Sequence, residues 1–130
     1  MYKVTIADVA ELTEEVLKVE FSSTTSGAAN ARSSDIDATL TITGRIAYDA
    51  DKPFMKDSTK EIAAWSMVKP DSPDTYKTVT VIFNHTGMTR TYELSHAFVI
   101  AFQEQFEDQN GYFQLVVRQK VDRLDGVKID

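Results

Sequence analysis

The sequence predicts a mainly β domain: an antiparallel β-barrel or sandwich of about seven strands, with one α-helix packed on it and a long loop between two early strands. Three observations lead to this fold class. Residues 36–48 alternate between apolar and polar side chains, the second half of the chain contains two hairpin patterns, and one segment carries a helical apolar stripe. The 130 residues contain no internal repeat and no linker, so we expect a single domain over residues 1–130.

The chain begins with two segments that place apolar side chains at every second position, residues 2–6 and residues 16–21. That period of two is typical of half-buried strands. The acidic stretch between them, Asp8 to Glu15, is expected to form a turn.

The clearest strand pattern covers residues 36–48. Its apolar face carries Ala38, Leu40, Ile42, Ile46 and Tyr48. Its polar face carries Thr39, Thr41, Thr43 and Arg45. We interpret the polar face as a surface that lines a lumen or meets another subunit; simple exposure to solvent is the alternative.

A long loop of small residues, 22–35, separates these two strand segments. Its central residues are Ser23, Thr24, Thr25, Ser26, Gly27, Ala28, Ala29, Asn30, Ala31 and Arg32. Such side chains bury little surface within their own subunit, and loops of this length in compact domains are usually functional or disordered. The loop is therefore the stretch that points most directly to a function.

One helix is expected after the early strands. Ser58 and Glu61 have the spacing of a capping box, and Ile62, Trp65 and Val68 form one apolar stripe. Residues 78–94 and 97–120 then read as two hairpins, the second with an Asn-Gly turn. In its first strand we place Phe98, Ile100, Phe102 and Phe106 on one face. The residues predicted to pack together as the core are Leu40, Ile42, Trp65, Phe98, Phe102, Leu115 and Val117.

The composition excludes several kinds of binding site and catalytic site. The net charge of −6 argues against general nucleic-acid binding, and the absence of cysteine excludes disulfides and thiolate metal sites. His85 and His96 have no third ligand in view, and neither a nucleophile elbow nor a phosphate-binding glycine loop is present. We therefore expect no catalytic residue, no metal and no cofactor, and rank an enzyme as a distant third reading. No apolar run is long enough to suggest membrane insertion. Residues 1–6 alternate and lack the apolar core of a signal peptide, so we expect a protein made in the cytoplasm.

The order of these parts resembles the tail-tube fold. The resemblance covers residues 4–121, and its strongest pieces are 35–43 leading into 51–55, and 113–120. The family includes the inner-tube proteins of contractile phage tails and of related injection particles. It also includes the haemolysin-coregulated protein of type VI secretion.

The resemblance implies a structural protein that forms hexameric rings stacked into a hollow tube. Strands of neighbouring subunits would join into one barrel around the lumen, and the loop at residues 23–32 would reach the next ring. The implied partners are further copies of the chain and sheath, baseplate and spike proteins, with DNA or protein cargo passing through the lumen without specific binding. Such a protein would be assembled in the cytoplasm and later belong to a virion tail or an extracellular particle.

An alternative function remains open from the residues alone. A monomeric β-barrel module could bind a ligand or a protein, with loop 22–35 as a flap over the site. Size on a gel-filtration column separates the two, because a tube protein forms rings or longer particles and a binding module stays monomeric.

Overall fold

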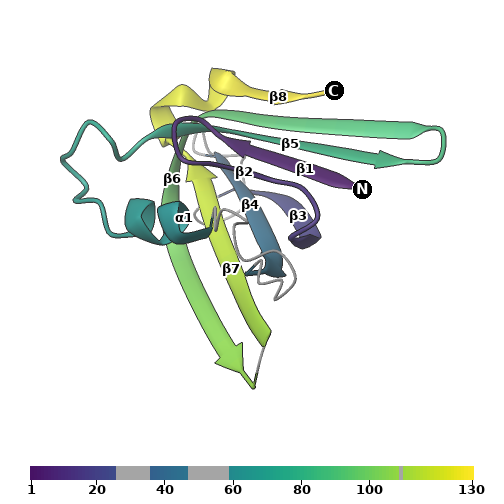
Figure 1. Ribbon diagram of the computed structural model, residues 1–130. Coiled ribbons are helices and arrows are strands. Elements are labelled where there is room, and N and C mark those ends of the chain that lie inside the picture. The colour runs from purple at the N-terminus through teal and green to yellow at the C-terminus, as the bar shows by residue number, and fades with distance from the viewer. Residues whose placement is uncertain (26–35, 47–58, 109) are drawn as a thin grey trace.

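The computed structural model describes residues 1–25, 36–46, 59–108 and 110–130. Within them the chain forms eight strands, one α-helix and one 3-10 helix (Figure 1). The elements are β1 (Tyr2–Ile6), β2 (Ala10–Leu12), β3 (Val16–Thr25), β4 (Ile36–Arg45), α1 (Thr59–Ser66), β5 (Lys77–His85), β6 (Met88–Glu107), β7 (Asn110–Gln119), η1 (Val121–Gly126) and β8 (Val127–Ile129).

The strands belong to one antiparallel sheet in the order β2-β1-β5-β6-β7-β4-β3, with β8 added beside β6. The long strand β6 divides this sheet. Its first part, residues 88–97, pairs with β5 and β8, and its second part, residues 97–107, pairs with β7. We call β2, β1, β5, β8 and the first part of β6 the β5 half-sheet. The second part of β6, with β7, β4 and β3, is the β4 half-sheet.

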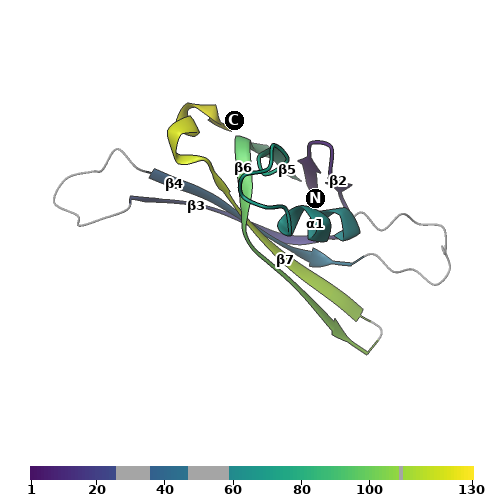
Figure 2. The same cartoon turned by 90° about the vertical axis from the view of Figure 1, so that its left-hand side faces the viewer.

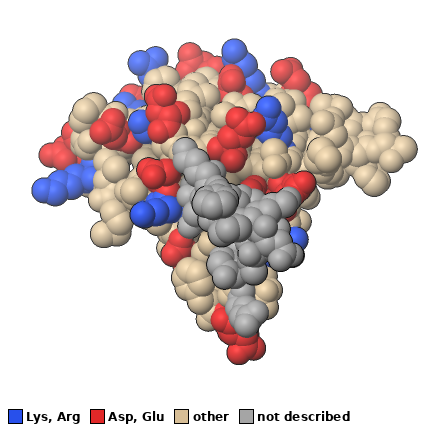
Figure 3. Space-filling view, in the orientation of Figure 1, with Lys and Arg blue, Asp and Glu red and all other residues tan. Residues whose placement is uncertain are grey.

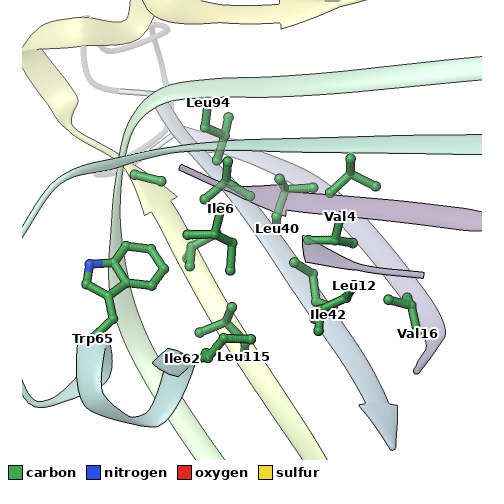
Figure 4. Close-up of a cluster of buried hydrophobic side chains, with 14 of the residues drawn as sticks. Val4, Ile6, Leu12, Val16, Leu40, Ile42, Ile62, Trp65, Leu94 and Leu115 are labelled. Carbon is green, nitrogen blue, oxygen red and sulfur yellow. The ribbon is translucent and has the colours of Figure 1, made fainter. Parts of the chain in front are cut away.

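The two half-sheets face each other across the hydrophobic core (Figure 4). β1 and β2 contribute Val4, Ile6 and Leu12 from one side, and β4 and β7 contribute Leu40, Ile42 and Leu115 from the other. Helix α1 adds Ile62 and Trp65, and the Trp65 indole N–H donates to the Thr75 carbonyl oxygen over 3.1 Å. The predicted fold class is confirmed as a mainly β, sandwich-like fold with one helix. Among the described strands the sheet does not close into a barrel, because β2 and β3 end its order.

Most of the predicted core is confirmed. Leu40, Ile42, Trp65, Leu115 and Val117 are all buried, and the partly buried Phe102 packs against them. Phe98 was placed wrongly. It pairs with Arg118 on the outer face, and its ring makes an edge contact with Tyr76 at 5.9 Å. The cause is a β-bulge between Val99 and Ala101, which shifts the inward positions of β6 by one residue.

The structure corrects the predicted elements at two places. The acidic stretch 8–15 contains a third short strand, β2, which pairs with β1. The Asn-Gly pair is not the turn between β6 and β7, because Asn110 and Gly111 already belong to β7 and pair with Glu107 and Phe106. Asp108 has a φ of 52°, a left-handed conformation that aspartate tolerates.

A buried glutamine ties β6 to the C-terminal segment. Gln119 is 1% exposed; it donates to the Ser95 hydroxyl over 3.0 Å and to the Arg123 carbonyl oxygen over 2.6 Å. Its own amide oxygen accepts from the His96 backbone N–H over 2.8 Å. All of its polar atoms therefore have partners, as a buried amide requires.

Candidate inter-subunit surfaces

The polar residues of β4 lie on the outer face of the β4 half-sheet. Thr39, Thr41 and Thr43 alternate with the buried Ala38, Leu40, Ile42 and Gly44, so the predicted alternation is confirmed. Across the four strands, one outer row contains Lys18, Thr43, Gln114 and Gln103, and the next contains Glu20, Thr41, Val116 and Ala101. We call this surface the threonine face; Arg45 extends it at the end of β4 and is exposed.

The threonine face carries mainly short hydroxyl and amide side chains. Lys18 and Glu20 neutralise each other as an ion pair at 3.0 Å. Arg118 keeps its charge, and its Nε donates to Thr39 Oγ1 over 3.4 Å. A surface of this kind is well hydrated but offers no concentrated charge to hold a nucleic acid or a charged protein.

The β4 half-sheet has two edges without a strand partner among the described residues. β3 pairs on one side with β4, and residues 98–107 of β6 pair on one side with β7. Unpaired strand edges present rows of backbone N–H and C=O groups and are templates for a further strand.

The loop residues named from the sequence are divided by the structure. Ser23, Thr24 and Thr25 are strand residues of β3, paired with Ala38, Asp37 and Ile36, so their assignment to a loop was wrong. β-branched and hydroxyl side chains fit a strand, and pairing with β4 continues through them. Ser26, Gly27, Ala28, Ala29, Asn30, Ala31 and Arg32 lie outside the described residues.

The two ends of the β4 half-sheet differ. β3 ends and β4 begins at the end where β7 finishes, and β6 ends and β7 begins at the opposite end. Figures 1 and 2 both show the β6–β7 hairpin projecting away from the rest of the domain. Figure 3 shows acidic side chains at the tip of that hairpin.

An apolar groove runs between β3 and the β5 half-sheet, and the sequence analysis missed it. It has a volume of about 290 Å³, with Tyr2, Val19, Val81, Phe83, Met88, Arg90 and Tyr92 as lining residues. Aromatic rings stiffen its wall, since Tyr2 and Phe83 lie 5.1 Å apart between ring centroids. Four separate strands supply these residues, so no local pattern in the sequence brings them together.

The described residues provide no metal-binding group of three or more His, Asp or Glu side chains. His85 ends β5 beside Phe83, and His96 Nδ1 lies 2.8 Å from the Ser95 hydroxyl. Among the described residues, no helix has the length and apolar character needed to cross a membrane.

Solved structures share this architecture over nearly the whole chain. A chain of the extended sheath–tube complex of PVC, an extracellular contractile injection system, matches with a TM-score of 0.55 and 11% identity; the match covers 99% of this chain and 87% of that one. The chain has the tail-tube fold. A chain of the anti-feeding prophage tube-terminating cap matches at 0.52 and 12% identity, covering 99% and 87%. A chain of the six-fold symmetrised anti-feeding prophage baseplate matches at 0.50 and 14%, covering 99% and 90%.

The tail-tube fold expected from the order of elements is therefore confirmed, at the level of fold. No protein-family model matches the sequence and no curated protein matches it. The threonine face and the two free edges both depend on strand order rather than on sequence identity. The shared fold therefore bears on both of them even where the sequences differ.

Proposed function

We propose that this chain is a non-enzymatic tube subunit that forms closed hexameric rings, which stack into the hollow inner tube of a contractile injection particle. One observation carries the proposal: among the described strands, the β4 half-sheet has two free edges, and these are complementary in direction. β3 and β6 of one chain are separated by three antiparallel pairings, so they run in opposite directions.

Ring closure follows from that geometry. A rotation about an axis along the strands leaves each strand's direction unchanged. β3 of one copy therefore meets β6 of the next as an antiparallel pair, and repeated addition gives one continuous antiparallel barrel. Closure pairs both free edges of every copy and so removes the aggregation hazard that such edges carry. The six-fold symmetry of one matched assembly favours six copies.

The threonine face is then the lumen wall. Rotation keeps the same face of every half-sheet toward the axis, and the alternative face is occupied by the core. Hydroxyl and amide side chains around a lumen favour passage of DNA or protein cargo, since they bind water and hold no dense charge. Thr39, Thr41, Thr43 and Arg45 are the β4 residues that we assign to this wall.

Stacking would use the two ends of the β4 half-sheet. We assign residues 26–32 to contacts with the next ring, together with the neighbouring ends of β3 and β4. β3 ends and β4 begins at the end of the half-sheet opposite the β6–β7 connection, and that end would face an adjacent ring when the strands run along the tube. Sheath and baseplate proteins are the expected outer and terminal partners, because the matched chains come from assemblies that contain them.

Electron microscopy and sedimentation velocity test the assembly directly. We expect rings of uniform diameter, and stacks of them at higher protein concentration. A chain that remains monomeric at every concentration would overturn the tube function and favour a monomeric binding module, whose ligand would occupy the groove beside β3.

A loop deletion separates stacking from ring formation. Removing residues 27–31 leaves every described strand pair intact and should change the free energy of unfolding by less than about 1 kcal/mol. We expect this variant to form single rings that do not stack. Normal tubes from the deletion variant would remove the loop from the stacking contact while leaving ring closure untouched.

A further inference from the structure

We propose that the groove beside β3 is the receptor for the β6 edge of a second copy: the inward residues Glu104 and Phe106 enter it, and Glu104 pairs with Arg90. This inference rests on the proposed ring, and it names the side chains that fix the neighbouring subunit. Glu104 and Phe106 are both exposed although they occupy inward positions of β6.

Phe106 lies on the same face of β6 as the core residues, but no residue in the described part of the chain buries it. It pairs with Gly111 on β7 and remains 68% exposed. Glu104 pairs with the buried Phe113, so its carboxylate also sits on the core-facing side of the sheet, and it is exposed. An aromatic ring and a carboxylate at inward positions of a free edge indicate a surface that awaits a partner.

The groove has the complementary composition, with apolar and aromatic walls and one arginine. Arg90 pairs with Phe83, which pairs with Tyr2, so all three lie in one cross-strand row. That row continues the inward face of the β5 half-sheet beyond the core; Val81 and Tyr92, both in the core or packed against it, form the adjacent row. Arg90 is the one charged residue that lines the groove, and among the described residues neither Arg90 nor Glu104 takes part in an ion pair.

Ring closure brings the two surfaces together on the same side of the sheet. Strands paired in a sheet keep directly opposed side chains on a common face. If β6 of the next copy pairs with β3, its inward row lies on the same face as Val19 and Phe21, the inward residues of β3. Val19 lines the groove, so the incoming Phe106 side chain arrives where the groove opens.

The charges and the apolar surfaces match. The tip of the β6–β7 hairpin is acidic (Figure 3), and Arg90 places a cation in the otherwise apolar groove. A carboxylate paired with an arginine inside an otherwise apolar contact fixes the register, because any shifted pairing would leave both charges buried and unpaired. Met88, which is 51% exposed at the groove, adds an adaptable apolar contact.

A competing role for Glu104 predicts the opposite result. Inward-pointing charges on edge strands often prevent strand addition. If Glu104 served that purpose, its removal in Glu104→Ala would strengthen association. Under the proposed pairing, the same substitution weakens association, because Arg90 of the next copy loses its partner.

Charge reversal with a swapped double variant is the decisive experiment. Glu104→Arg and Arg90→Glu are each expected to raise the protein concentration for half-maximal ring assembly by about tenfold or more, measured by sedimentation velocity. The double variant should return to within about threefold of the parent, since the pair is restored in reversed order. Glu107→Arg is the matched control: it makes the same charge change on the same strand, on the outer face, and should leave ring assembly unchanged.

The outcomes are separable. Thermal melts of dilute monomer should show near-parental stability for all variants, because the substituted side chains are exposed. A parent that never assembles would overturn both the ring and this contact. A parent that forms rings, with single reversals that assemble equally well, or with a double variant as defective as either single one, would overturn the contact and leave the tube function standing.

Discussion

Gly44→Ala is a sharp test of how tightly the two half-sheets are packed. Gly44 is buried in β4, directly opposite Phe113 on β7. A methyl group added there would lie 2.5 Å from the Glu15 carbonyl oxygen, 2.7 Å from Phe113 Cε1 and 2.8 Å from Phe113 Cζ. Real Cβ atoms essentially never show contacts under 3.0 Å, so the backbone or the ring must move.

Neither neighbour can move freely. The Glu15 carbonyl oxygen accepts a hydrogen bond of 2.7 Å from the Arg45 N–H, and Phe113 is 2% exposed and stacks near Phe102. Overpacking of this kind costs about 1–3 kcal/mol, while replacing glycine by alanine recovers about 0.4–1 kcal/mol through the unfolded chain. We expect a net loss of about 1–2 kcal/mol, which corresponds to a fall in Tm of roughly 4–10 °C for a domain of this size.

Urea denaturation of dilute protein measures the loss, with Thr43→Ala as the control on the outer face. The control should stay within about 0.5 kcal/mol of the parent. Adding Phe113→Leu to Gly44→Ala removes the aromatic ring from the clash. The double variant should therefore lose less free energy of unfolding than the two single variants lose in sum. A Gly44→Ala chain as stable as the parent would refute the close approach of β4 to β7 and residue 15.

Two further substitutions test the core and the hydrogen bonds by which Gln119 joins β6 to η1. Gln119→Leu should cost about 2–4 kcal/mol in denaturant unfolding, because several buried hydrogen bonds to β6 and η1 lose a partner at once; a loss under about 0.5 kcal/mol would show that water replaces them. Phe102→Ala should destabilise the chain by about 2–4 kcal/mol, more than Phe98→Ala, since the bulge turns only Phe102 inward. Equal losses would contradict the bulge.

The sequence alone predicted those parts of the fold whose signal is local. The alternation in residues 36–45 was reliable because one face of β4 is fully buried and the other is polar. The stripe of Ile62 and Trp65 located α1 for the same reason. In both elements a single period separates apolar from polar positions, and tertiary packing follows that period.

Other parts depend on contacts that no local pattern records. Residues 97–102 are mostly apolar at both odd and even positions, so the sequence cannot fix which parity faces inward, and the bulge in β6 went unseen. β2 is three residues long and exists through its pairing with β1. The groove beside β3 escaped notice because its walls come from strands that are far apart in the chain.

The long strand β6 has a consequence for the order in which the chain folds. β5, β6 and β7 follow one another closely in the sequence and pair consecutively, so this meander can form from neighbouring residues soon after it leaves the ribosome. β1 and β4, by contrast, pair with β5 and β7, whose residues are synthesised much later. The nascent N-terminal third therefore waits with exposed strands until the meander appears. Synonymous changes that slow translation after residue 46 should increase aggregation of the newly made chain without altering the stability of the finished protein.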